Sequence, residues 1–185
     1  MGNIMDYIEW RGDLPFTQSE FNDVDNLILA CFSYVNLDGI QEAASQNGIE
    51  LKALTEKFLQ LHTEKELKED KSFIRFAPFM MLEMAKTERF GQCVIRNYVN
   101  EIVAEEAQQF SAVEICLSDG TSYISFRGTD DTIVGWKEDF NLSTGVVPAQ
   151  ERAVEYLRRI AGSLQEMVRV GGHSKGGNLA VYGAV

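Results

Sequence analysis

The stretch GGHSKGG (residues 171–177) constrains the fold of this chain more than any other feature of its sequence. A short apolar run with β-strand character (residues 167–171) precedes it, and the helix-compatible run NLAVYGAV follows it. A backbone that reverses from strand to helix within one residue holds that residue at positive φ, and the flanking backbone then passes so close that only small residues fit. The sequence therefore predicts a sharp strand–turn–helix unit with Ser174 at its tip.

Within this stretch, Gly172-x-Ser174-x-Gly176 matches the G-x-S-x-G pattern of a nucleophile elbow. An elbow holds the serine hydroxyl clear of the sheet, while N–H groups at the start of the following helix point towards the reaction zone. We expect Gly177 to let that helix lie close to its neighbouring strands, and His173 to point away from the serine hydroxyl. The alternative is a glycine-rich turn in which Ser174 only caps the helix.

A second motif, the strand-like run YISFRGT, ends at Thr129, 45 residues before Ser174. In an α/β-hydrolase, one oxyanion donor lies on the loop after an earlier strand, and the other is the amide that follows the nucleophile. Here we expect these donors to be the amides of Thr129 and Lys175, and the loss of one such donor typically costs about 2.7–4 kcal/mol. We expect the Arg127 side chain to pair with a carboxylate beneath this loop, and the Lys175 side chain to face solvent or substrate.

The combination of FRGT, W-x-x-D-F (residues 136–140) and GHSKGGNLA resembles the lipase class 3 pattern, in which FRG[ST] carries the oxyanion residue and GHSxGG the nucleophile. Residues 6–13, 21–26 and 37–39 make the chain similar to one lipase-like branch, the Mbeg1-like family of bacterial α/β-hydrolases. The resemblance covers nearly the whole chain and is most specific over residues 126–140 and 170–180. It implies an α/β-hydrolase fold, a three-layer α/β/α sandwich, in a single domain spanning residues 1–185. It also implies hydrolysis of a carboxylic, lipid-like ester.

The base that a serine nucleophile needs is missing from the expected place. Acyl transfer by serine requires a general base oriented by a carboxylate, and α/β-hydrolases supply these in the order Ser, Asp or Glu, His. Residues 181–185 contain no acid and no histidine, and the whole chain has 2 histidines. His173 adjoins the serine, and His62 lies in the helical first half. We therefore expect the N-terminal portion of a longer hydrolase, ending just after the elbow, with little turnover by itself.

Two other classes of function fit the same residues. One is a non-catalytic, hydrolase-like binding module, and the other is a thioesterase or peptidase on the same scaffold. In each case the partner is a small-molecule or lipid-like ligand, and no residue pattern indicates a cofactor or a metal. The sequence does not indicate an oligomeric state.

The apolar spacing predicts a mainly helical leader followed by an α/β sheet. Residues 23–34 and 51–67 carry the i, i+3, i+4 stripe of amphipathic helices, and Pro78 suits the first turn of another. Residues 111–118 and 121–127 flank Asp119-Gly120, which favours a two-residue hairpin with positive φ at both residues. Residues 94–103 fit either a helix or a strand, and residues 149–165 form another amphipathic pattern. We expect a sheet with an antiparallel edge.

Charge and composition exclude several partners. The formal net charge is −11, which disfavours nucleic acid and anionic membrane surfaces as partners. No apolar run approaches the roughly 20 residues of a membrane span, and the N-terminus lacks the basic start of a secretory signal. The three cysteines, Cys31, Cys93 and Cys116, are far apart among apolar neighbours and fit buried thiols in a reducing compartment. These features predict a cytoplasmic protein.

Overall fold

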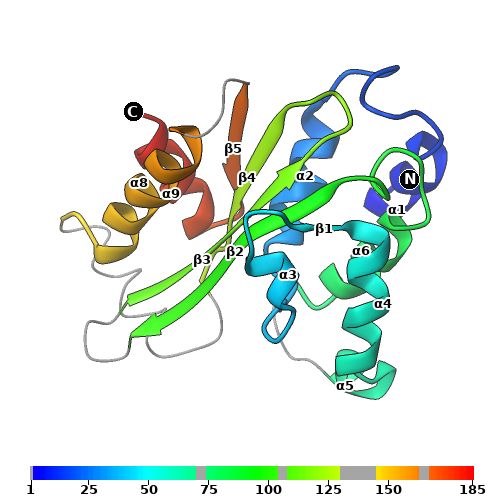
Figure 1. Ribbon diagram of the computed structural model, residues 1–185, viewed down its shortest axis with the longest axis horizontal. Coiled ribbons are helices and arrows are strands. Elements are labelled where there is room, and N and C mark those ends of the chain that lie inside the picture. The colour runs from blue at the N-terminus through cyan, green and yellow to red at the C-terminus, as the bar shows by residue number, and fades with distance from the viewer. Residues whose placement is uncertain (1, 70–73, 104–107, 130–144, 163–166) are drawn as a thin grey trace.

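Among the described residues, a mixed sheet of five strands, in the order β1-β2-β3-β4-β5, lies at the centre of the fold. The computed structural model describes residues 2–69, 74–103, 108–129, 145–162 and 167–185. Helices cover both faces of the sheet (Figure 1): α8 and α9 lie on one side, and the N-terminal helices lie on the other. The mixed α/β class expected from the sequence is therefore present.

The first half of the chain is helical, as expected. The helix predicted over residues 23–34 ends at Phe32. The helix predicted over residues 51–67 is divided, because Thr63 and Glu66 exchange side-chain-to-backbone hydrogen bonds and begin a new helix. Pro78 occupies the first turn of α6. The helices are α1 (Ile4–Arg11), α2 (Asp23–Phe32), α3 (Gln41–Ala44), α4 (Leu51–Leu61), α5 (Glu64–Glu69) and α6 (Ala77–Met84).

The sheet is antiparallel except for its last pair. The segment that fitted either a helix or a strand forms β2, and the strand after α8 (Pro148–Ala161) runs parallel to β4. Antiparallel pairing therefore extends over four strands rather than an edge alone. The strands are β1 (Ile49–Glu50), β2 (Val94–Val103), β3 (Gln108–Cys116), β4 (Ser122–Phe126) and β5 (Val168–Gly172).

The hairpin between β3 and β4 is present, but its loop differs from the expected one. The Gly120 amide donates to the Leu117 carbonyl, and the Leu117 amide donates to the Thr121 carbonyl. Gly120 has φ +83°, whereas Asp119 is not among the described non-glycine residues with positive φ. The connection is thus a three-residue loop with glycine at the left-handed position. The Asp119 carboxylate stabilises it by accepting from the amide and hydroxyl of Thr121.

Alternate residues of the central strands face two separate cores. Phe110 and Ala112 of β3, with Ile124 and Phe126 of β4, pack against α8 and α9. The intervening residues face the N-terminal helices; the buried side chains of this second core on the sheet are Ile95, Tyr98, Val113, Ile115, Leu117 and Tyr123. The period of two along each strand therefore explains how one sheet carries a helical layer on each face.

Helix α2 is attached to the sheet by polar as well as apolar contacts. The Tyr123 hydroxyl donates to Asn26 Oδ1 at 2.8 Å, and the Ser125 hydroxyl donates to the Leu29 carbonyl at 2.7 Å. Both side chains project from β4, so the helix axis is held against the strand that leads to the FRGT motif. The chain leaving α2 is consequently directed to the carboxyl ends of β4 and β5.

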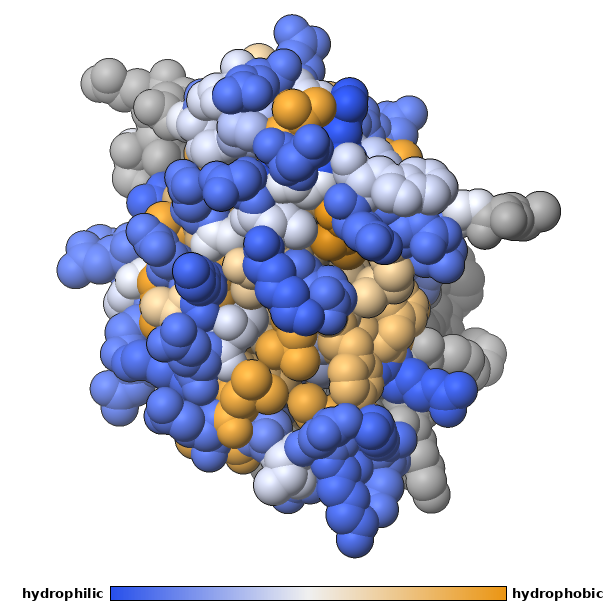
Figure 2. Space-filling model, turned by 90° about the vertical axis from the view of Figure 1, so that its right-hand side faces the viewer, coloured by the Kyte–Doolittle hydropathy of each residue, from blue (hydrophilic) through white to orange (hydrophobic). Residues whose placement is uncertain are grey.

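The surface of the helical half carries an apolar area bordered by hydrophilic side chains (Figure 2). Exposed apolar side chains of these helices include Leu59 of α4 and Phe76, the N-cap residue of α6. Among the described residues, no helix combines the length and apolar character required to cross a membrane.

Candidate active site

Ser174 lies at the junction of β5 and α9 (Lys175–Ala184) with φ +58° and ψ −126°. A non-glycine residue in such a conformation typically costs about 1–3 kcal/mol, which the surrounding structure must offset. Its side chain is exposed, and it makes no capping hydrogen bond to the helix that it precedes. Ser174 therefore occupies the cap position without acting as a cap.

Gly172 and Gly176 are required by the close approach of the turn to β4. A Cβ atom on Gly176 would overlap the Phe126 carbonyl oxygen, and one on Gly172 would lie 2.6 Å from that same oxygen. Real Cβ contacts are essentially never this short, so the turn admits no side chain at either position. Gly177 is less restricted, because its Cβ would lie 3.3 Å from the Gly172 carbonyl oxygen.

The FRGT motif ends beside the elbow. Phe126 pairs with Gly172 in the parallel register of β4 and β5, so both strands end at the same edge of the sheet. A Cβ on Gly128 would lie 2.5 Å from the His173 carbonyl oxygen and 3.1 Å from Ser174 Cβ. The structure thus brings Gly128 next to His173 and Ser174, and the half-buried Thr129 is the next residue along the chain. Trp136 and Asp139, the other residues of the motif set, lie outside the described residues.

The Lys175 side chain does not face solvent or substrate, contrary to expectation. It is 4% exposed, and its Nζ donates to the Gln109 carbonyl oxygen in β3 at 3.0 Å. The first residue of α9 thus directs its side chain across the end of β4 towards β3. A buried ammonium requires such an acceptor, so this side chain joins α9 to the sheet and leaves only its backbone amide near Ser174.

Among the described residues, the printed partner of the Arg127 side chain is an amide rather than the carboxylate expected beneath the loop. Its Nη2 donates to Asn100 Oδ1 at 2.5 Å, and Asn100 Nδ2 donates to Asp38 Oδ2 at 2.7 Å. Asn100 and Arg127 both lie opposite Ser111 in adjacent strands, so they share one row of the sheet. The amide of Asn100 therefore connects the guanidinium to the acid.

The two histidines are both engaged away from the Ser174 hydroxyl. His173 Nδ1 lies 3.0 Å from the Tyr34 hydroxyl, and the two rings meet edge-on at 5.7 Å. His62 follows α4 and packs against Phe58 with the two rings tilted and their centroids 4.4 Å apart. Neither imidazole is hydrogen-bonded to Ser174 in the described part of the chain. Tyr34 was not singled out by the sequence, where it stands only as the last residue of an amphipathic pattern.

A second polar cluster lies on the α8 face of β3. Glu114 is fully buried and accepts hydrogen bonds from Arg96, Asn97 and Ser122. Burial raises the pKa of Glu114, but these three hydrogen bonds and the Arg96 charge outweigh it and hold the pKa below its ordinary value. The neighbouring Cys116 is only partly buried, whereas Cys31 and Cys93 are buried as expected, and all three are free thiols. This cluster belongs to the core rather than to the Ser174 site.

No group of three or more potential metal ligands occurs among the residues that the structure describes.

The fold and this site define a mixed α/β protein with a strained, exposed serine between a parallel strand and a helix. The chain matches the Mbeg1-like family over residues 84–185, more than half of its length, and it belongs to that family. No curated protein and no solved structure matches the chain.

Proposed function

We propose that the chain carries the nucleophile and oxyanion site of a serine hydrolase of lipase or esterase type, with Ser174 as the nucleophile. The observation that carries the proposal is the backbone of Ser174, which is held at φ +58° with its side chain exposed. Strain of this kind persists where the surrounding structure maintains it, and it clusters at active sites, ligand clamps and switch regions.

In the proposed reaction, Ser174 Oγ attacks the carbonyl carbon of a carboxylic ester as a base takes its proton. The tetrahedral intermediate carries an oxyanion, which the amides of Thr129 and Lys175 hold. The alcohol leaves with a proton, and water then attacks the acyl-serine and releases the acid. The adjacency of Gly128 to Ser174 Cβ supports this assignment, because the residue after Gly128 supplies the first amide.

The base is the part of the mechanism that the two histidines do not provide. His173 is engaged by Tyr34 and His62 lies on Phe58. We therefore expect the 185-residue chain to turn over esters slowly by itself and to respond to an added base. The net charge of −11 favours a neutral, lipid-like ester over an anionic one.

Because His173 contacts Tyr34 and His62 contacts Phe58, neither histidine activates Ser174, and this favours a second candidate, a hydrolase-like module that binds without catalysis. A thioesterase or a peptidase would use the same elbow, and a comparison of oxyester, thioester and amide substrates separates these activities.

A fluorophosphonate probe, applied with imidazole as the added base, tests the assignment, because it forms a stable adduct with an activated serine. We expect peptide mass spectrometry to find the adduct on Ser174 before any other serine. The Ser174→Ala variant should lose it, whereas Ser19→Ala, at a half-buried serine of the N-terminal half, should retain it. Labelling that persists in Ser174→Ala, or that is spread evenly over several serines, would refute the nucleophile and leave the binding module.

A further inference from the structure

Tyr34 connects the N-terminal helical half to the elbow. It lies two residues after the end of α2, and its hydroxyl is 3.0 Å from Nδ1 of His173, 139 residues further along the chain. Because Tyr123 and Ser125 attach α2 to β4 by hydrogen bonds, the position of Tyr34 relative to the sheet is set by the helix itself.

The same hydroxyl touches the loop that carries the proposed oxyanion donor. A Cβ on Gly128 would overlap the Tyr34 hydroxyl oxygen while lying 3.1 Å from Ser174 Cβ. The tyrosine hydroxyl and the serine side chain therefore both lie close to the Cα atom of Gly128. A hydroxyl at this point limits how far the loop can move away from the elbow on the α2 side.

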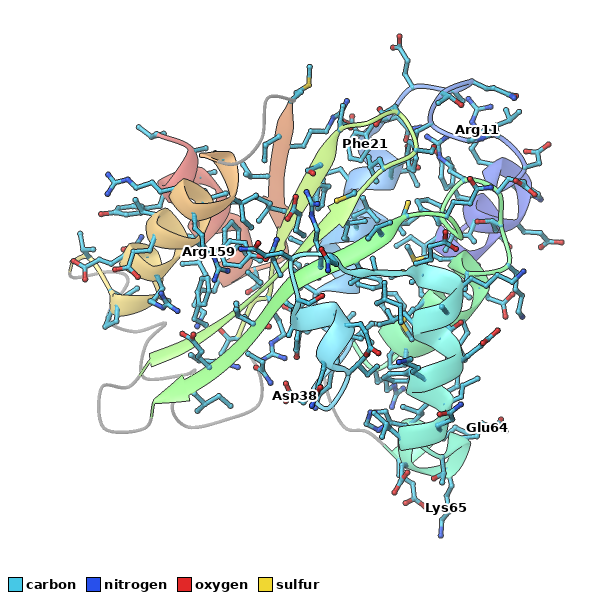
Figure 3. The ribbon with its side chains drawn as sticks, in the orientation of Figure 1. Arg11, Phe21, Asp38, Glu64, Lys65 and Arg159 are labelled. Atoms are coloured by element: carbon cyan, nitrogen blue, oxygen red, sulfur yellow. The ribbon has the colours of Figure 1, made fainter. Side chains whose placement is uncertain are left out.

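A second, indirect contact from the same segment reaches the neighbouring residue of the FRGT motif. Asp38, labelled in Figure 3, lies between α2 and α3 and accepts a hydrogen bond from Asn100 at 2.7 Å. Asn100 in turn accepts from Arg127, the residue before Gly128. The chain between Tyr34 and Asp38 thus contacts the motif directly at Gly128 and indirectly at Arg127.

We propose that Tyr34 and Asp38 form a brace that positions the Gly128–Thr129 loop against Ser174, so that both are positioning residues of the site. This inference rests on the function proposed for Ser174, and it assigns a role to a segment outside residues 84–185, where the family match lies. Oxyanion donors act only when they lie about 2.7–3.1 Å from the developing charge, so a small displacement of the loop weakens catalysis.

Removal of the Tyr34 hydroxyl tests the brace. We expect Tyr34→Phe to lower the rate constant for acylation of Ser174 by a short-chain nitrophenyl ester, measured with imidazole as added base, by roughly tenfold to a hundredfold, since a displacement of about 1 Å has effects of this size. The acylation rate at saturating ester should fall, while the ester concentration at half-saturation changes little. Asp38→Ala, at an exposed residue, should lower the rate in the same direction by a smaller factor.

The matched control is Tyr7→Phe. The Tyr7 hydroxyl also makes two hydrogen bonds in the helical half, to Asp25 and from Asn22, but it does not contact the elbow. Its loss should leave the acylation rate within about twofold of the wild type. Equal rates in Tyr34→Phe and the wild type would overturn the brace.

Hydrogen–deuterium exchange gives a readout that does not depend on chemistry. We expect the amides of residues 127–129 to exchange faster in Tyr34→Phe and Asp38→Ala than in the wild type or Tyr7→Phe. If the wild type itself is not acylated above Ser174→Ala, the proposed function fails, and the exchange result alone decides the brace. Unchanged exchange in both brace variants would refute it.

Discussion

Arg89 and Asp25 form a bidentate ion pair in which neither side chain is exposed. The remaining guanidinium donors go to the carbonyls of Leu14, Ser19 and Glu20, and the guanidinium stacks on the Phe16 ring at 4.0 Å. One side chain thus fixes the irregular segment between α1 and α2. Because the charge is fully paired and hydrogen-bonded, its burial is tolerated.

Loss of Arg89 should therefore be far more damaging than loss of an exposed arginine. We expect Arg89→Ala to lower the free energy of unfolding by about 3–5 kcal/mol, because Asp25 is left buried and unpaired. Arg152→Ala removes a half-exposed arginine from Glu101 and Glu155, and it should cost less than about 1 kcal/mol. Urea unfolding followed by circular dichroism measures both, and equal losses would contradict this account of Arg89.

The strain at Ser174 predicts an unusual order of stability. Glycine adopts positive φ without steric cost, so Ser174→Gly should be more stable than Ser174→Ala by about 1 kcal/mol. At Asn178, an exposed position within α9, alanine should instead be the more stable replacement by about 0.5–1 kcal/mol. Thermal unfolding of the four variants gives the comparison. Alanine preferred at both positions would show that residue 174 is not held in the strained conformation.

The contact of Gly176 with β4 makes this glycine sensitive to a single added carbon. In Gly176→Ala the Cβ would overlap the Phe126 carbonyl oxygen, which should cost about 1–3 kcal/mol and displace the elbow. Gly145→Ala is the matched control, because a Cβ there meets no atom within 4 Å. It should change stability by less than about 0.5 kcal/mol. Equal stability of the two variants would contradict the close approach.

The hydrogen bonds to Glu114 predict a pH-dependent contribution to stability. Its pKa is lowered in the folded state, so the stabilisation is complete above the ordinary carboxyl pKa, near 4.3, and is lost as the pH falls through the folded value. We expect Glu114→Gln to lose about 1.5–3 kcal/mol at pH 7. The difference from the wild type should shrink below about pH 4. If chemical unfolding gives the same stability difference between Glu114→Gln and the wild type from pH 7 to pH 3, the stabilisation does not come from the ionised Glu114 carboxylate. Glu83→Gln, at an exposed ion pair with Lys86, serves as the control.

Local steric patterns made part of this structure predictable. The positive φ of Ser174 and the close approach of Gly172 and Gly176 follow from the demand that a strand reverse into a helix, which residue type alone reveals. The Asp119-Gly120 pair located a hairpin, but its loop length depends on which residues of β3 and β4 pair. Spacing detected both amphipathic helices, although the capping pair of Thr63 and Glu66 interrupted the second.

Side-chain partners across the fold were not predictable. The acceptor of Lys175 lies in β3, 66 residues earlier, and Arg127 meets Asn100 only because their strands share a register. Tyr34 has no local signal that distinguishes it from other residues ending an amphipathic helix. Contacts of this kind depend on how α2 and α9 dock on the sheet, which a single sequence does not encode locally.

The rate of ester cleavage with and without an added base tests the role of Ser174 most directly. Nitrophenol release from a short-chain nitrophenyl ester is followed at increasing imidazole concentrations for the wild type and for Ser174→Ala. We expect a small difference between the two proteins without imidazole, and this difference should grow as imidazole supplies the base that neither His62 nor His173 provides. Equal rates at every imidazole concentration would contradict Ser174 as a nucleophile.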